Sequence, residues 1–388
     1  MKPIYLFLFF LLSSSFLSAA EAEKVETLAL GAIAPNFDLP GVDGKRYQLS
    51  DFQSARALAV VFTCNHCPDA RAARGKLIKL QKDYQSKGVA VIAISGNDDK
   101  ALLEEEIGYS VYGDSFEDMK AVAKEEGYEF PYLYDGETQS VTKAYGAQAT
   151  PHVFVFDQAR KLRYAGRLDD ARRSRKDVGP AYVRQALDAI LAGKEVETKS
   201  TRAFGCSTKW SWKRENEVKD EKEWSALPVT LENLDTKQAK ALAANKTEKL
   251  RIINFWSTTC GPCIVEFPEL VETMRRFQFR PVDFITVSLD PVAKKDQALK
   301  FLKSQRAALA PRLAKSVNEE GRVSNNYLFT EQNLDQLAEA IDPEWSGALP
   351  HTVIIAPGGE ILWRHTGRFD VVELRRAIMK HFDAVDGE

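Results

Sequence analysis

The sequence predicts an α/β protein that contains one fold twice, each copy with a central mixed sheet flanked by helices. The chain has 388 residues, too many for one ordinary domain and enough for two that each bury a core. In each half an apolar strand leads into a Cys-x-x-Cys sequence and a helix, at Cys64–Cys67 and at Cys260–Cys263. A proline followed by histidine and another apolar strand lies 84 positions after Cys67 (Pro151) and 87 after Cys263 (Pro350). Duplication of a βαβ-derived fold explains this repetition better than coincidence does.

The first half contains the elements of such a domain in order. Residues 57–63 form an almost uninterrupted apolar run, as expected of a central strand covered on both faces. Residues 69–87 then alternate charged and apolar side chains at helical spacing until Gly88 ends the helix. The other predicted elements are strand 89–95, helix 115–126, strands 153–156 and 162–166, and helix 181–191.

The second half repeats that order, starting with the apolar strand 250–256. Residues 292–305 and 331–341 are predicted to be helices inserted before Pro350. The latter helix is expected to frame one side of the second cysteine pair.

The segment that joins the halves is charged, yet it contains Trp210, Trp212 and Trp224. High charge favours a solvated linker, whereas three tryptophans favour a strap that packs on a domain. The predicted limits are 21–193 for the first domain, 194–227 for the linker and 228–388 for the second domain.

The amino end has the layout of a secretory signal peptide. Lys2 precedes the apolar run 4–12, and the small residues Ser18-Ala19-Ala20 come before the acidic Glu21. A retained anchor is the alternative, but this run is short for a bilayer. We expect cleavage after Ala20, a periplasmic or secreted protein, and no transmembrane segment after cleavage. Nucleic-acid binding is not expected, because 53 basic residues do not exceed 55 acidic ones.

The position of the cysteines predicts their chemistry. A cysteine at the junction between a strand and the following helix lies close to unpaired backbone N–H groups and to the positive end of the helix dipole. These favour the thiolate and lower the pKa of such cysteines from about 8.5 to roughly 3.5 to 7.5. Since the thiolate is the species that attacks disulfides, both pairs are predicted to carry out thiol–disulfide exchange.

The second half resembles the thioredoxin superfamily, and within it the TlpA-like extracytoplasmic thiol–disulfide oxidoreductases. The matching residues are Phe255-Trp256, Cys260-Gly261-Pro262-Cys263, Glu266-Phe267-Pro268 and Leu349-Pro350. The resemblance implies that Cys260 attacks a disulfide and that Cys263 resolves the mixed disulfide, with its proton managed by Glu266. It also implies a cis-proline at Pro350, facing the pair. Asn254 stands where thioredoxin has a buried aspartate.

The first half resembles an uncharacterised peroxiredoxin-like (AhpC/TSA, redoxin) group. It shares with that group Cys64-Asn65-His66-Cys67-Pro68 and, later, Gly205-Cys206-Ser207-Thr208-Lys209-Trp210. True peroxiredoxins hold peroxide with Pro-x-x-x-Thr-x-x-Cys, but Val60 and Cys64 occupy the proline and threonine positions here. Dithiol exchange is therefore expected, with Cys64 attacking and Cys67 resolving. In a peroxidase reading, Cys67 takes the peroxidatic role.

Other residues are candidates for supporting roles. His66 is expected to lower the pKa of Cys64 and to make the first couple the more oxidising one. This gives the hypothesis that electrons pass from the second pair to the first. Pro151 is the expected cis-proline of the first domain, presenting Thr150 as a strand edge to an incoming disulfide. Cys206 is either a resolving cysteine or a buried small residue, and His152 and His351 are either proton shuttles or structural.

Together these features predict an extracytoplasmic oxidoreductase that needs no cofactor or metal. Its expected partners are disulfide-bearing proteins and a membrane or periplasmic thiol reductant. The alternatives are a thiol-dependent peroxidase that uses the first domain, and a copper(I)-handling redox chaperone, because cysteine and histidine are ligands that suit copper(I). A non-catalytic binding module is a further alternative.

Overall fold

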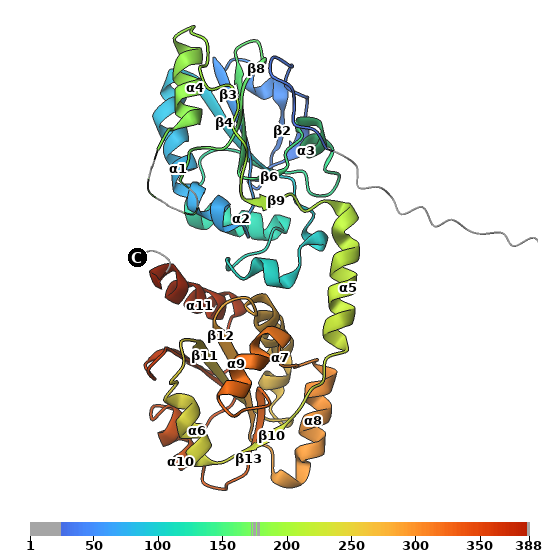
Figure 1. The fold of residues 1–388 in the computed structure, drawn as a ribbon, viewed down its shortest axis with the longest axis vertical. Helices are drawn as coiled ribbons and strands as arrows, with labels where there is room; N and C mark the ends of the chain where they lie inside the picture. Colours follow the sequence, from blue (N-terminus) through green and yellow to red (C-terminus); the bar gives the residue numbers. More distant parts are fainter. Residues whose placement is uncertain (1–24, 172, 174–175, 177–178, 386–388) are drawn as a thin grey trace, which may run out of the picture.

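The computed structural model describes residues 25–385 except 172, 174–175 and 177–178 (Figure 1). Two sheet-containing bodies are joined by the long helix α5 (Arg214–Ser225), which runs along one side of the molecule. The predicted signal peptide, residues 1–20, lies outside the described part. Within the described residues, none of the helices is both long and apolar enough to cross a bilayer.

The first body is built on a five-stranded mixed sheet. Its strand order is β5 (Tyr132–Tyr134), β4 (Val89–Ser95), β3 (Ala57–Phe62), β7 (His152–Asp157) and β8 (Leu162–Gly166). Strand β3 is parallel to β4 and antiparallel to β7. All six β3 residues are buried, and they alternate between two hydrophobic cores, one on each face of the sheet. The covering helices are α1 (Pro68–Tyr84), α2 (Phe116–Glu126), α3 (Ser140–Tyr145) and α4 (Tyr182–Leu191).

The second body is built on a six-stranded mixed sheet. Its strand order is β10 (Glu232–Leu234), β13 (Asn326–Phe329), β12 (Val282–Ser288), β11 (Leu250–Trp256), β14 (His351–Ile355) and β15 (Ile361–Thr366). Its helices are α6 (Thr236–Ala243), α7 (Gly261–Arg276), α8 (Lys295–Ser304), α9 (Pro311–Glu319), α10 (Leu334–Ile341) and α11 (Val371–Val385). The predicted α/β class, with a mixed sheet flanked by helices in each half, is confirmed.

The tryptophans of the joining segment pack against both bodies. Trp210 and Trp212 stack with ring centroids 4.9 Å apart, and the Lys143 ammonium lies over the Trp212 ring. At the other end of α5, Trp224 is buried and its indole N–H donates to the Arg306 carbonyl oxygen at 3.0 Å. The segment therefore has the docked form that its tryptophans predict.

The carboxyl end of α7 packs against the first body. Arg276 donates to the Val111 carbonyl oxygen at 3.0 Å and forms an ion pair with Glu104, and Gln278 donates to Glu105 at 3.1 Å. Helix α11 adds ion pairs from Arg376 to Glu125 and from Asp383 to Arg71. These contacts fix which end of α7 faces the first body.

Candidate redox sites

The second cysteine pair lies at the start of α7. Cys260 is the residue just before this helix, and it forms a disulfide with Cys263, S–S 2.07 Å. The Cys263 backbone N–H also donates to Cys260 Sγ at 3.3 Å. Cys263 is fully buried, whereas Cys260 is partly exposed. Cys260 is therefore the more accessible residue of the pair.

Glu266 follows Cys263 by three residues, so both side chains lie on one face of α7. Its carboxylate accepts from Asn254 Nδ2 at 3.1 Å and from the Phe369 backbone N–H at 3.3 Å. Burial raises the pKa of Glu266 to about 7, although these hydrogen bonds oppose the shift. A carboxyl group that titrates near neutral pH beneath the disulfide suits proton exchange with a cysteine.

Asp290, which the sequence reading missed, holds the loop in front of Cys260. Its carboxylate accepts from the Thr258 backbone N–H at 2.9 Å and from the hydroxyls of Ser257 and Thr258 at 2.8 and 2.7 Å. Burial opposes ionisation of this group, but these hydrogen bonds lower the pKa of Asp290. The only sequence signal was an aspartate two residues beyond a buried strand.

His351 follows Pro350 and packs as a core side chain. Its ring stacks on Trp345 with centroids 4.9 Å apart, and Nδ1 lies 2.8 Å from the Thr366 hydroxyl. Burial lowers the pKa of His351, although Asp342 opposes the shift at 3.3 Å from Nε2. These contacts fit the structural alternative. The peptide bonds before Pro350 and Pro151 are both cis, as predicted.

The first cysteine pair is reduced and deeply buried. Cys64 follows β3, and Cys67 precedes α1, which begins with Pro68. Both sulfurs contact Thr150: Cys64 Sγ lies 3.2 Å from its hydroxyl, and the Cys67 thiol donates to its carbonyl oxygen at 3.1 Å. The exposed fraction of Cys64 is 3% and that of Cys67 is 0%.

A buried aspartate organises the loop between these two cysteines. Asp114 accepts from the backbone N–H groups of Asn65 and His66 at 2.8 and 3.1 Å, and from Asn97 Nδ2 at 2.7 Å. It also lies 2.6 Å from His66 Nδ1. Burial opposes charge on both groups, but their mutual attraction raises the pKa of His66 and lowers that of Asp114. The sequence reading missed Asp114, which precedes an ordinary helix start at Ser115.

The pKa of Cys67 is lowered, in part by the charge of His66, whereas the pKa of Cys64 is raised. Burial opposes the shift, but hydrogen bonds from Cys206 and Cys64 and the charge of His66 hold the pKa of Cys67 well below its usual value. Burial, the hydrogen bond to Cys67 and the charge of Asp114 raise the pKa of Cys64. The prediction that His66 lowers the pKa of Cys64 is therefore wrong, because burial, the hydrogen bond to Cys67 and the charge of Asp114 together raise that pKa.

Cys206 lies beside this pair. Strand β9 (Cys206–Ser207) pairs with β6 (Ala149–Thr150), so that Cys206 is opposite Thr150. The strand edge at Thr150, predicted to receive an incoming disulfide, is therefore covered by the chain itself. The family-like motif around Cys206 was visible in the sequence, but its pairing with Thr150 depends on tertiary structure.

His152 lines a groove of about 890 Å³ beside β6 and β9. Its ring packs on Phe154 with centroids 4.5 Å apart, and burial lowers its pKa to about 4. Arg167 and Phe204 are also part of the groove wall. A neutral, buried imidazole at neutral pH fits a structural role better than a proton shuttle.

Among the described residues, one group of three ligand atoms lies close enough to hold a metal ion. Atoms of Cys64, His66 and Asp114 fall within 4.8 Å of one another. The ion pair between His66 and Asp114 accounts for this proximity without a metal, so we assign no metal here.

The structure does not bring the two cysteine pairs together. Cys260 precedes α7, while Arg276 at its other end contacts the first body. A helix of 16 residues is about 24 Å long. In this arrangement the two cysteine pairs are therefore not in direct contact, as electron transfer from the second pair to the first by thiol–disulfide exchange would require.

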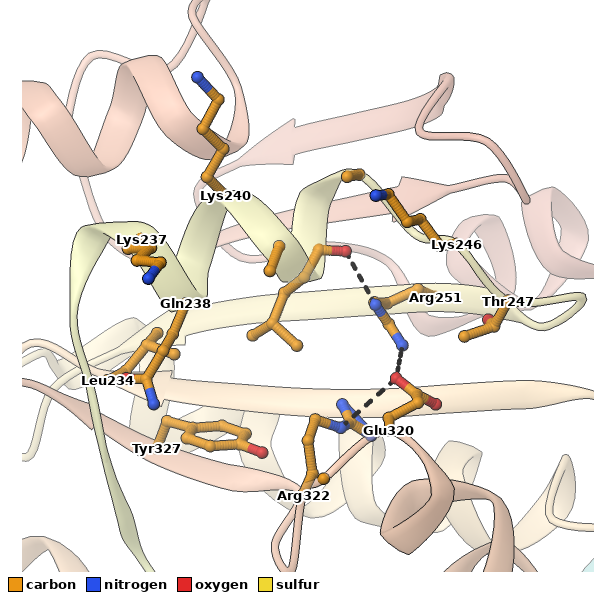
Figure 2. A pocket seen from close by; sticks show the side chains of 14 residues that line it. Leu234, Lys237, Gln238, Lys240, Lys246, Thr247, Arg251, Glu320, Arg322 and Tyr327 are labelled. Atoms are coloured by element: carbon orange, nitrogen blue, oxygen red, sulfur yellow. Dashed lines mark hydrogen bonds and ion pairs between the residues drawn. The ribbon is translucent and has the colours of Figure 1, made fainter.

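A further pocket of about 590 Å³ lies away from the sulfurs (Figure 2). Figure 2 shows the Arg251 and Arg322 guanidinium groups directed toward Glu320. Both arginines also pair with the buried Asp283, at 3.1 and 2.8 Å. Arg251 is the second residue of β11, whereas Cys260 follows the end of that strand. The pocket thus borders an ion-pair network at the opposite end of the sheet.

Comparisons with known proteins give a family and several similar proteins. Residues 30–165 and 225–364 both match the model of the AhpC/TSA family. The thiol-disulfide oxidoreductase ResA of Geobacillus thermodenitrificans (strain NG80-2) is 24% identical over 136 residues, covering 35% of this chain and 68% of that protein. A hypothetical protein of Sinorhizobium meliloti 1021 is 42% identical, covering 48% of this chain and 97% of its own, with TM-score 0.43. An uncharacterised conserved protein of Geobacillus kaustophilus is 44% identical. The match covers 47% of this chain and 93% of that protein, with TM-score 0.43.

Proposed function

The chain belongs to the AhpC/TSA family, and from this premise we propose that it is an extracytoplasmic thiol–disulfide oxidoreductase acting on protein disulfides through two Cys-x-x-Cys couples. The observation that carries the proposal is the Cys260–Cys263 disulfide, with a partly exposed first cysteine and the buried Glu266 carboxyl on the same helix face. The two family matches support the proposed domains 21–193 and 228–388, with 194–227 as linker. Residues 1–20 are proposed to be the signal peptide that directs export.

The second couple is proposed to work as follows. The Cys260 thiolate attacks a substrate disulfide, forming a mixed disulfide and releasing one substrate thiolate, which takes up a proton. Cys263 then loses its proton to Glu266 and attacks Cys260 Sγ, which releases the second substrate thiol. One substrate disulfide is reduced to two thiols, and the enzyme dithiol becomes the Cys260–Cys263 disulfide. Pro350, whose preceding peptide bond is cis, is proposed to position the substrate backbone.

The first couple is proposed to use Cys67 as its thiolate. Cys67 precedes α1 and has the lowered pKa, whereas Cys64 keeps its proton at neutral pH. Pro151 follows Thr150, whose hydroxyl lies 3.2 Å from Cys64 Sγ, so its proposed role is to position Thr150 beside the pair. The roles first expected for Cys64 and Cys67 are thus exchanged.

Mixed-disulfide trapping tests the proposal. In a Cys263→Ser variant, Cys260 attacks but nothing resolves the product, so we expect protein substrates to remain attached through Cys260. The Cys260→Ser/Cys263→Ser variant is the matched control and should retain none. A wild-type protein whose free thiol content does not rise on mild treatment with a dithiol contradicts the proposal.

A peroxidase is the second candidate, because Cys67 occupies the position of the peroxidatic cysteine in the family and has a lowered pKa. Peroxide would oxidise the Cys67 thiolate to a sulfenic acid. Another thiol would then condense with this sulfenic acid to form a disulfide and water. Peroxide consumption that depends on dithiol and is lost in Cys67→Ser supports this candidate. Equal consumption by the wild-type protein and the variant excludes it.

A further inference from the structure

We propose that Cys206 is a third redox-active cysteine of the first site, and that a Cys67–Cys206 disulfide connects the buried pair with external thiols. This inference rests on the proposed function of the first couple and adds to it the route by which electrons enter and leave.

The three cysteines pack together. The Cys206 backbone N–H donates to Cys67 Sγ at 3.3 Å, and the Cys206 thiol also donates a hydrogen bond to Cys67. Cys64, Cys67 and Cys206 form one small cluster together with Ala70. A new bond from Cys67 to Cys206 thus needs no large movement of the chain.

Their exposure differs in a way that assigns the roles. Cys64 and Cys67 are buried, whereas Cys206 is partly exposed. An external thiolate has to reach the sulfur that it attacks, along the axis of the disulfide bond. Of the three cysteines, Cys206 is the one that is not buried.

The segment around Cys206 is fixed against the site on both sides. Thr208 donates from its hydroxyl to the Ala147 carbonyl oxygen at 2.8 Å, and the Lys209 backbone N–H donates to Asn97 Oδ1 at 2.9 Å. Gly205 has a φ of +129°, and a Cβ there would lie 2.0 Å from the Thr150 carbonyl oxygen. Only glycine therefore permits this approach of the Cys206 segment to Thr150.

The proposed exchange balances at each step. Starting from a Cys64–Cys67 disulfide, the Cys206 thiolate attacks Cys67 Sγ, the Cys64–Cys67 bond breaks, and Cys64 leaves as a thiolate that takes up a proton. An external dithiol then attacks Cys206 Sγ with one thiolate, and Cys67 leaves as a thiolate. The second thiol of the reductant closes its own disulfide and releases Cys206. One dithiol is oxidised and one enzyme disulfide is reduced, and the reverse sequence oxidises the site.

The electrostatics of the cluster favour the second step, in which Cys67 is the departing sulfur. Thiol–disulfide exchange is faster when the departing sulfur has a low pKa, and Cys67 is the cysteine whose pKa is held low. The hydrogen bond to Cys67 and burial raise the pKa of the Cys206 thiol while Cys67 is a thiolate. Once Cys67 is part of a disulfide it carries no charge. The negative charge that raises the pKa of the Cys206 thiol is then gone.

The test uses full-length chains that carry Cys260→Ser and Cys263→Ser, so that only the first site reacts. Adding Cys64→Ser leaves Cys67 and Cys206, and mild oxidation with diamide should then join them within one chain, as shown by peptide mapping. Adding Cys206→Ser instead leaves the Cys64–Cys67 disulfide, whose reduction by dithiothreitol should be slowed. A Gly205→Ala variant retains all three cysteines but displaces the segment, and its reduction should slow about 100-fold, the order expected for an ångström of misplacement.

The outcomes separate the inference from the proposed function. If Cys64–Cys67 forms and is reduced equally fast with and without Cys206, and mapping finds Cys206 unmodified throughout, the inference is overturned while the first couple stands. If no disulfide forms among the three cysteines, the proposed function of the first couple fails as well. A Cys67–Cys206 bond together with slowed reduction in both variants establishes the route.

Discussion

Replacing Asp114 with alanine is expected to destabilise the first body by about 3 to 5 kcal/mol, the range found when one partner of a buried ion pair is removed. The change leaves the backbone N–H groups of Asn65 and His66 and the Asn97 amide without their acceptor, all in buried surroundings. It also removes the carboxylate that keeps the His66 imidazole charged. Hydrogen exchange of the β3 segment at increasing denaturant concentration measures the loss.

The same substitution should raise the pKa of Cys67. Without Asp114, burial favours the neutral imidazole of His66, and a neutral His66 no longer stabilises a Cys67 thiolate. Titration of the ultraviolet thiolate absorbance checks this, in Asp114→Asn if the alanine variant unfolds. Glu129→Ala, an exposed carboxylate in the same body, is the control and should change neither quantity. Unchanged stability and an unchanged thiolate titration in the Asp114 variants would contradict the assignment.

The pH dependence of the pair has a defined sign. The folded pKa of His66 is raised, so its contribution to stability is complete below its unfolded pKa and is lost as the pH rises through the folded value. The folded pKa of Asp114 is lowered, so its contribution is present above its unfolded pKa and is lost as the pH falls through the folded value. The free energy of unfolding of the Asp114 variants should therefore differ most from that of the wild type at pH values above the unfolded pKa of Asp114 and below the unfolded pKa of His66.

The sequence predicts the scaffold well because local patterns determine it. The apolar run before Cys64 is the fully buried strand β3, and Cys67 and Cys260 directly precede the helices α1 and α7. The two cis peptide bonds also follow from the resemblance. These features depend on residues that are neighbours in the chain.

The chemistry of the first pair was predicted less well because it depends on residues distant in the chain. Asp114 lies 48 positions from His66, and its effect is to disfavour a thiolate at Cys64. Cys206 lies 139 positions from Cys67, and it occupies the strand edge that Thr150 was expected to offer to a substrate. Spacing within a motif gives the chemical type of a site, whereas the charge at each sulfur depends on contacts that only the fold supplies.

Glu266→Gln is expected to slow thiol–disulfide exchange at the second pair by about 100-fold at neutral pH, the lower end of what a positioned general base contributes. The wild-type rate should rise as the pH passes through about 7, because the ionised Glu266 carboxylate can then accept the proton of Cys263. A glutamine cannot take up that proton, so the variant should lack this rise. Single-turnover oxidation of the reduced protein by a small disulfide, followed across pH, measures both effects.

Stability measurements separate loss of a base from loss of structure. The folded pKa of Glu266 is raised above its usual value, so its contribution to stability is complete at low pH and is lost as the pH rises through about 7. The variant removes that decline, although its amide can replace only one of the two acceptors that Asn254 and Phe369 use. Relative to the wild type, we therefore expect the stability of the variant to be highest above pH 7. In the same pH range, its exchange rate should fall furthest below that of the wild type. Glu360→Gln, an exposed carboxylate in the same body, is the matched control, and a pH profile identical in all three proteins would show that Glu266 does not handle the proton.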